Sequence, residues 1–272
     1  MSMTGGFSFF DVNAAALFDG ATIVASTNQD DANYILSGEK AYRWQSVGSD
    51  DVTQEVMTIT LPVPVKFDRL FLVQHNFKGF TIKYGASLDF TNVRGLNGNT
   101  ANISEADFTY DTAYYEFDAV TTDTIIITID TTQIANVEKY LMWFIATTEL
   151  GTFIGYPQNP NLTLDRKITR QKNAAKGQRI LKHKERAKLN IDMKHYPIQQ
   201  DIDLLSDLQD RDDPFLVWPH GGKPAQFRLR IRGYRTRDIF LMQISSPMGV
   251  GFFKNTYSLS GETKVKMEEV DR

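Results

Sequence analysis

The sequence predicts a mainly β protein built from two units. Between Ala21 and Ile154, short runs of β-branched and aromatic residues alternate with turn residues, and no long helical periodicity occurs. Charge is divided unevenly, because residues 1–150 hold 8 basic and 19 acidic residues whereas residues 151–272 hold 22 and 14. Gly, Pro and Asn cluster at 151–163. We therefore expect an N-terminal segment (1–20), an acidic β unit (21–155) and a basic β unit (156–272).

The overall composition narrows the class of protein. The 272 residues are 42% hydrophobic, which suffices for a large core, and the absence of cysteine excludes disulfides and thiolate metal sites. There is no apolar run of about 18 residues that would span a membrane. The N-terminus lacks the basic region and apolar core of a signal peptide, so we expect a chain made and used without Sec export.

The first unit is expected to be a β-sandwich of short strands. The predicted strands are 21–26, 56–65, 69–77, 80–85, 124–130 and 140–151. The Tyr-rich segment 108–117 alternates well enough to be a further strand with one aromatic face. We interpret that face as ordinary sheet packing, with recognition of a carbohydrate or a protein as the alternative.

The second unit is expected to combine strands with one helix. Residues 162–170 and 179–196 suggest two long strands joined by a tip at 171–178, and a helix over 171–188, interrupted by Gly177, is the alternative. A helix is predicted at 198–210, with Pro197 near its start and Pro214 forcing a stop. Further strands are expected at 215–219, 225–236, 239–246, 252–261 and 262–270. In 225–236, Arg228, Arg230 and Arg232 share one face.

A local concentration of basic residues lies in the predicted hairpin. Its ten members are Arg166, Lys167, Arg170, Lys172, Lys176, Arg179, Lys182, Lys184, Arg186 and Lys188. Residues 165–190 contain no aromatic side chain that would stack on a base, which weakens a nucleic-acid reading. We expect the basic residues to contact acidic surface on a neighbouring subunit or ring, of the kind that Asp201, Asp203, Asp207 and Asp210 supply.

Candidate chemical sites are few. No zinc-protease, nucleophile-elbow, P-loop or dinucleotide signature occurs, so we expect no enzyme, no cofactor and no metal. The acidic pairs 30–31, 50–51 and 212–213 lack the spaced ligands of a calcium loop. Trp44 and His75 are weak candidates for a ligand loop. Core packing for Trp44 and a turn-stabilising pair of His75 with Asn76 are the preferred readings.

The order of features in the first unit resembles a discoidin-type, galactose-binding-like jelly roll. The resemblance rests on ATIVAS (21–26), YRWQS (42–46), ITLPVPVKFDRLFLVQHNF (59–77), FTIKYG (80–85) and the closing ELG (149–151). It covers about half the chain and implies a sandwich whose loops at one end bind sugars or other ligands in many members. No ligand-binding signature of the family stands out here.

The second unit resembles the β-sandwich-plus-helix domain of phage tail tube and distal tail proteins. The matching features are the charged hairpin, the helix 198–210 and a closing strand pair that ends in KVKMEEV (264–270). The resemblance implies a tail-tube-like sandwich or barrel with a long hairpin arm. It also implies that six subunits join into a ring through their sheets. That family usually begins with the ring domain, so residues 1–20 are expected to complete its sheet and to make the jelly roll an insertion.

These resemblances together predict a structural virion component of a long-tailed phage, made in the host cytoplasm. It would form a homo-oligomeric ring at the tail tip or baseplate and contact the tail tube, the hub and receptor-binding proteins, with DNA only in transit. The outward jelly roll would serve host attachment, including contact with a cell-surface glycan. The alternatives are a carbohydrate-binding module of an adhesin or enzyme and a DNA-binding protein, which would bind with steep salt dependence.

Overall fold

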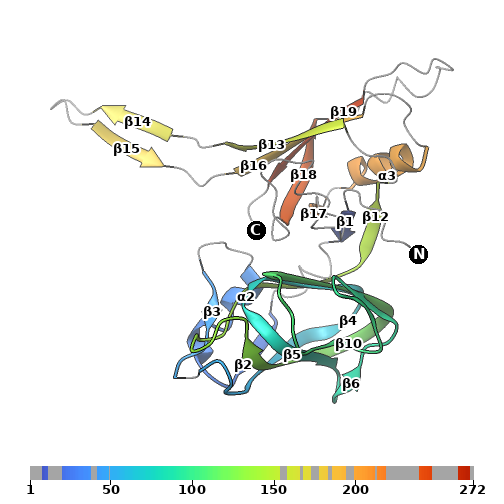
Figure 1. The fold of residues 1–272 in the computed structure, drawn as a ribbon. Helices are drawn as coiled ribbons and strands as arrows, with labels where there is room; N and C mark the ends of the chain where they lie inside the picture. The colour runs from blue at the N-terminus through green and yellow to red at the C-terminus, as the bar shows by residue number, and fades with distance from the viewer. Residues whose placement is uncertain are drawn as a thin grey trace.

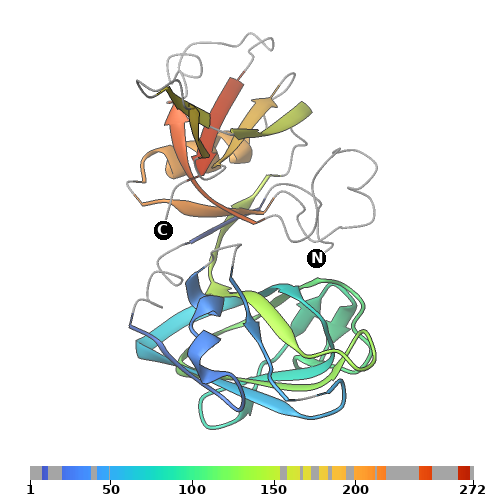
Figure 2. The same ribbon diagram turned by 90° about the vertical axis from the view of Figure 1, so that its left-hand side faces the viewer.

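The computed structural model shows two antiparallel sheet systems, one above the other (Figures 1 and 2). It describes residues 8–11, 20–37, 42–48, 50–153, 158–165, 168–172, 178–182, 186–193, 199–211, 213–218, 239–246 and 263–269. The mainly β fold class and the jelly-roll sandwich are confirmed. The predicted strands at 225–236 and 252–261, including Arg228, Arg230 and Arg232, lie outside the described residues.

The jelly roll is a ten-stranded system with two short helical segments. Its strands are β2 (Thr22–Ala25), β3 (Trp44–Gln45), β4 (Glu55–His75), β5 (Phe77–Tyr84), β6 (Leu88–Asp89), β7 (Val93–Gly95), β8 (Gly98–Thr100), β9 (Ser104–Glu105), β10 (Thr112–Thr132) and β11 (Tyr140–Thr147). Helical segments η1 (Gln29–Asp31) and α2 (Tyr34–Ser37) connect β2 to β3. The main sheet order is β3-β11-β4-β10-β5-β6, and β2 also pairs with β4.

Two long strands, β4 and β10, run through both layers of the sandwich. The first half of β4 pairs with β2 and with the second half of β10, whereas its second half pairs with β11 and with the first half of β10. The sequence predicted two strands, 56–65 and 69–77, where the structure has the single strand β4, which contains Pro62 and Pro64. Both prolines fall where the β4–β10 register shifts between Thr60 and Val65, so neither removes a ladder hydrogen bond that the sheet needs.

A seven-stranded sheet forms the second unit, in the order β12-β1-β17-β18-β19-β16-β13. Its strands are β1 (Ser8–Asp11), β12 (Glu149–Thr152), β13 (Gln158–Asp165), β16 (Arg186–Met193), β17 (Phe215–Trp218), β18 (Phe240–Ser246) and β19 (Thr263–Glu269). Helix α3 (Gln199–Gln209) agrees with the predicted helix 198–210. Strand β1 comes from the start of the chain and pairs with both β12 and β17.

The chain therefore leaves the seven-stranded sheet at Asp11 and returns to it at Glu149. The two crossings lie side by side, because the Asp11 backbone N–H donates to the Thr148 carbonyl at 2.9 Å. The Thr147 hydroxyl also donates to the Asp11 carbonyl. The sequence predicted one strand over 140–151 and a boundary after residue 155, but the strand divides at Thr148, between β11 and β12.

Strands β1 and β17 are buried on both faces. Successive side chains of a strand point to opposite faces. Phe9 and Val217 accordingly pack with α3 and the other apolar residues of the seven-stranded sheet. Phe10 and Trp218 instead pack against Phe71 and its neighbours in the jelly roll. This explains why FLVW (215–218) is continuously apolar, and it fixes one layer of the jelly roll against the second unit.

The basic hairpin has the predicted extended form. Strands β14 (Ile168–Lys172) and β15 (Gln178–Lys182) pair from Ile168↔Lys182 to Lys172↔Gln178. The helix that was the alternative over 171–188 is therefore wrong for the described part. In Figure 1 this hairpin extends away from both sheet systems, beyond β13 and β16.

Candidate functional site

An aromatic and polar surface lies where α2, β3 and β11 meet. We call it the Tyr42 surface. Its members are Tyr34, Tyr42, Arg43, Gln45, Glu138 and Tyr140. It is a candidate for ligand recognition because the large aromatic side chain of Tyr42 is 49% exposed.

The pairing of β3 with β11 decides which side chains face solvent here. Tyr140 pairs with Gln45, and Leu141 pairs with Trp44. Trp44 and Leu141 point inward and are fully buried in the jelly-roll core. Because side chains alternate, Gln45 and Tyr140 face outward together. The Arg43 guanidinium lies 4.4 Å from the centroid of the Tyr140 ring, an attractive cation–π geometry.

The polar groups of the Tyr42 surface form a chain of hydrogen bonds. The Arg43 Nη2 donates to Gln45 Oε1 at 2.8 Å, and Gln45 Nε2 donates to the Glu138 carboxylate. Asn76 holds the Glu138 end, since its Nδ2 donates to the Glu138 carbonyl and its Oδ1 accepts from the Tyr140 N–H. This bonding orients the guanidinium and amide in advance of any ligand.

The Tyr42 ring is held by a second tyrosine. Its centroid lies 4.9 Å from that of Tyr34, and the ring planes differ by 21°. Tyr34 begins α2, which is anchored by the buried Ile35 and Leu36. One face of the Tyr42 ring is thus covered by Tyr34, and a large part of the side chain stays accessible to solvent.

Trp44 and His75, the two weak ligand candidates of the sequence, are packing residues instead. Trp44 is fully buried, and its indole N–H donates to the Thr27 carbonyl at 3.0 Å. His75 is 1% exposed and contacts the rings of Phe77, Phe80 and Phe108. Burial lowers the pKa of His75 from 6.5 to about 3, so the imidazole is neutral. Both side chains are closed to solvent, as core packing predicted for Trp44. His75, which was predicted to stabilise a turn together with Asn76, packs among aromatic rings and accepts the Phe77 N–H.

The acidic pair 50–51 serves a turn rather than a calcium ion. The Asp50 carboxylate accepts hydrogen bonds from the Thr53 hydroxyl and N–H and from the Val52 N–H. The Thr53 contact is the largest cause that lowers the pKa of Asp50. The buried Lys139 ammonium donates to the Asp50 carbonyl at 2.8 Å. Within the described ranges, no group of three or more His, Cys, Asp or Glu residues could hold a metal ion.

The ten basic residues of the predicted contact surface are only partly described. Arg166, Lys167, Lys176 and Lys184 lie outside the described residues. Arg170 and Lys172 lie on β14, Arg179 and Lys182 on β15, and Arg186 and Lys188 on β16. Among the acidic residues of α3, Asp201 is buried whereas Asp203 and Asp207 are exposed, and Asp210, directly after the helix, is exposed as well.

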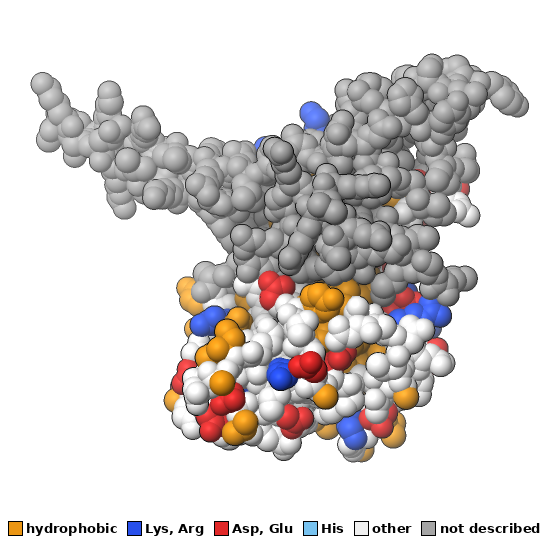
Figure 3. Space-filling model, viewed as in Figure 1, with side chains coloured by type: hydrophobic (Ala, Val, Ile, Leu, Met, Phe, Trp, Pro, Cys, Tyr) orange, Lys and Arg blue, Asp and Glu red, His pale blue; other side chains and the backbone are white. Residues whose placement is uncertain are grey.

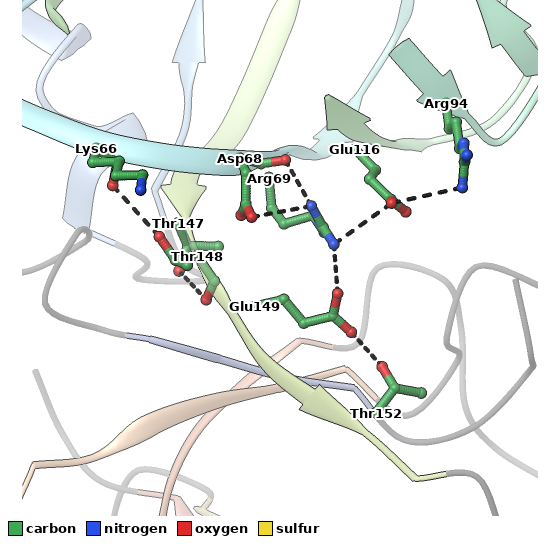
Figure 4. A network of polar contacts seen from close by, with 9 residues as sticks. All are labelled: Lys66, Asp68, Arg69, Arg94, Glu116, Thr147, Thr148, Glu149 and Thr152. Carbon is green, nitrogen blue, oxygen red and sulfur yellow. Dashed lines mark hydrogen bonds and ion pairs between the residues drawn. The ribbon is translucent and has the colours of Figure 1, made fainter. Parts of the chain in front are cut away.

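A partly buried ionic network, centred on the buried Arg69, joins the jelly roll to the second unit (Figure 4). Arg69 on β4 lies 2.5 Å from Glu149 on β12 and 3.7 Å from Glu116 on β10, and Arg94 lies 3.9 Å from Glu116. Glu149 also accepts from the Thr152 hydroxyl at 2.6 Å. The sequence analysis missed this network, because its members are far apart in the chain and meet only through strand pairing.

Figure 3 shows one face of the jelly roll. On this face, acidic and basic side chains form small, separated groups among uncharged ones. No helix in the described part of the chain is long and apolar enough to cross a membrane.

Comparisons with known proteins return no matching family model and no matching curated sequence. Solved structures do match. Chitosan-binding module 2 of a chitosanase/glucanase from Paenibacillus sp. IK-5, in complex with chitotriose, is 15% identical with a TM-score of 0.38, covering 48% of this chain and 98% of that one. The module CpGH89CBM32-5 from Clostridium perfringens, in complex with GalNAc-β-1,3-galactose, is 8% identical with a TM-score of 0.37, covering 50% and 97%. A putative alpha-L-fucosidase from Bacteroides thetaiotaomicron is 14% identical with a TM-score of 0.38, covering 49% and 28%.

Proposed function

We propose that the chain is a non-catalytic binding protein whose jelly roll recognises carbohydrate through the Tyr42 surface. The observation that carries the proposal is the half-exposed Tyr42 ring beside the bonded chain of Arg43, Gln45 and Glu138. A sugar ring has an apolar C–H face and a rim of hydroxyl groups. The aromatic face suits the first, and the guanidinium, amide and carboxylate suit the second.

Rigidity supports the same proposal. Binding costs free energy when flexible side chains must be ordered. Here Tyr34 holds the Tyr42 ring, Tyr140 holds the Arg43 guanidinium, and Asn76 fixes the strand end. A surface ordered before the ligand arrives loses little conformational entropy on binding, so weakly interacting sugars can be held by few contacts.

The test is a titration of the full, ¹⁵N-labelled chain with soluble oligosaccharides, followed by NMR and calorimetry. The panel includes chitotriose and GalNAc-β-1,3-galactose, the sugars in two of the similar structures. Tyr42→Ala is expected to weaken binding about fivefold, because one aromatic stacking contact contributes about 1 kcal/mol. Leu88→Ala is the matched control, since Leu88 is 57% exposed on β6, away from the Tyr42 surface.

The proposal fails if no sugar shifts the resonances of residues 42–45 and 138–140. It also fails if Tyr42→Ala and Leu88→Ala bind equally well. Arg43→Gln separates two contributions of that side chain, since it removes the charge and keeps a hydrogen-bond donor.

We propose a second candidate, a structural ring component at a phage tail tip, which one observation favours. The jelly roll is inserted between β1 and β12 of the seven-stranded sheet, and a paired hairpin extends from that sheet. Such a layout suits a sheet domain that assembles with copies of itself through an arm and carries the jelly roll outward. In this candidate the partners are further copies and other tail proteins, the site of action is the virion, and DNA passes only in transit.

Light scattering and negative-stain imaging at low and high salt test the second candidate. Closed rings that loosen with salt would support it, because exposed ion pairs are screened by salt. The triple change Lys182→Glu, Lys184→Glu and Arg186→Glu should then abolish rings and leave a folded monomer, whereas Lys182→Arg, Lys184→Arg and Arg186→Lys should keep them. A monomer at every salt concentration, or rings that survive the charge reversal, would count against it.

A further inference from the structure

The solvent-facing side of one jelly-roll layer is almost free of charge. Strand β2, the first half of β4, the second half of β10, and β5 form this layer. Their inward residues, such as Ile59, Ile82 and Ile127, belong to the core. We call the outward set the threonine face. Its members are Thr22, Val24, Val56, Thr58, Thr60, Thr81, Lys83, Thr124, Ile126 and Thr128.

Strand register places these residues in rows across the sheet. One row runs Thr22, Thr60, Thr124. The next runs Val24, Thr58, Ile126, Lys83, and the third runs Val56, Thr128, Thr81. Neighbouring rows lie about 6.8 Å apart along the strands, and neighbouring strands about 4.8 Å apart. The face is therefore a regular array of hydroxyl and methyl groups.

The hydroxyl groups of this array are open to a partner. The Thr124 hydroxyl donates to Asp123. Within the part of the chain that the structure describes, the hydroxyls of the other threonines make no hydrogen bond to a side chain, namely those of Thr22, Thr58, Thr60, Thr81 and Thr128. Val24 is 66% exposed. β-branched side chains have few rotamers, so the array is already ordered and little entropy is lost when it is covered.

Charge is confined to the edges of the threonine face. Lys83 is its one charged member, and the Asp89 carboxylate lies 3.6 Å from its ammonium. At the border, Asp130 accepts a hydrogen bond from Gln54 at 2.8 Å. Residues 1–150 nevertheless carry a net charge of −11. The unit is acidic, but this layer carries almost no net charge. Because the charges of two binding surfaces are usually complementary, such a layer suits a neutral partner.

We propose that the threonine face is a second binding surface, which docks on the packed surface of a neutral polysaccharide. Such a polymer repeats hydroxyl groups and C–H faces along and across its chains, so it can use the hydroxyls and the Val and Ile methyl groups of the array together. This surface is separate from the Tyr42 surface, and it takes an insoluble, ordered ligand where the Tyr42 surface takes a single sugar chain.

A second copy of the chain suits this face less well. Stacked sheets lie about 10 Å apart, which equals the Debye length at about 0.1 M salt. Two units of −11 would then repel each other at close range, because the one basic group on each face, Lys83, is already paired with Asp89. A neutral polymer avoids that repulsion.

A pelleting assay with the full chain tests the proposal. The solids are microcrystalline cellulose and crystalline chitin, with pectate beads as an anionic comparison. The variant Thr58→Lys with Ile126→Glu places opposite charges on directly opposed residues, so it keeps both the net charge and the sheet. It is expected to weaken binding to the neutral solids at least about tenfold, because both charges would have to be desolvated. Thr58→Val with Thr128→Val keeps the shape and removes two hydroxyls, and a smaller loss is expected.

The outcomes separate this proposal from the Tyr42 surface. Loss of pelleting in the charged variant, with unchanged pelleting in Tyr42→Ala, supports it. Equal pelleting of the charged variant and the unaltered chain overturns it, as does failure of the unaltered chain to bind either neutral solid. Light scattering that shows a dimer, lost in the charged variant, would overturn it in favour of an interface between copies. If the charged variant does not fold, full pelleting by the valine variant overturns the role of the hydroxyls.

Discussion

The buried His75 makes the stability of the jelly roll depend on pH. Its imidazole is 1% exposed, its Nδ1 accepts the Phe77 N–H at 3.0 Å, and its Nε2 has no hydrogen-bond partner within the described residues. Burial lowers its pKa from 6.5 to about 3 in the folded state. Between these two values the unfolded chain binds a proton that the folded chain does not, so stability falls as pH falls.

The magnitude follows from that shift. Each pH unit between about 6.5 and 3 costs about 1.4 kcal/mol, and at pH 5 the cost is about 2 kcal/mol. Over the whole window it approaches about 5 kcal/mol, a large share of the stability of a typical domain. The substitution His75→Gln removes the titrating group and keeps a side-chain acceptor for the Phe77 N–H.

Urea unfolding at pH 7, 6, 5 and 4, followed by tryptophan fluorescence, measures the effect. His75→Gln should be less stable than the unaltered chain at pH 7, and the gap should narrow or reverse by pH 4. Carboxylates titrate in the same range but contribute equally to both proteins, so the difference isolates His75. A difference that stays constant from pH 7 to pH 4 would refute the reasoning.

Three further changes test the junction and the core. Arg69→Met leaves Glu149 and its neighbours without their guanidinium, so the free energy of unfolding in urea should fall by about 2 to 4 kcal/mol. Arg94 is more exposed, so Arg94→Met should lower it by under about 1 kcal/mol. Equal effects of the two variants would contradict the network. In Gly151→Ala the new Cβ would lie 2.8 Å from the Leu204 methyl carbons, so a loss of about 1 to 3 kcal/mol is expected in thermal unfolding, and no loss would mean that Leu204 moves freely. Burial is the largest influence on Lys139 and lowers its pKa, so the folded chain loses this proton before the unfolded chain does. Stability should therefore rise as pH climbs toward 10.5, and Lys139→Met should lack that rise in urea titrations.

Much of the strand content was predictable because local pattern dictated it. The β-branched run at 124–130 predicted a strand that ends within two residues of the end of β10, and the apolar stripe of 198–210 predicted α3 to within one residue at each end. The Tyr-rich segment proved to be packing, with Tyr115 in the jelly-roll core and Tyr114 at the junction. Lengths were less predictable, since β4 continues through the gap that separates the predicted strands 56–65 and 69–77.

The candidate site was hardly predictable from sequence. Tyr42, Arg43 and Gln45 are neighbours in the chain, but Glu138 and Tyr140 join them only through the β3–β11 pairing. Trp44 drew attention as the largest aromatic residue nearby, although strand alternation turns it inward. The useful signal was the polar residue on either side of Trp44, because those positions share the opposite face.

The two adjacent crossings at Asp11 and Thr148 have a consequence for how this architecture can change over evolution. The jelly roll enters and leaves the seven-stranded sheet at one point, so an exchange of the intervening segment would leave the path of the host sheet intact. A replacement needs two chain ends that lie close together and an apolar layer that covers Phe10, Leu216 and Trp218. Different modules can thus be substituted on the same seven-stranded sheet, so the inserted segment can diverge while the sheet that carries it stays the same.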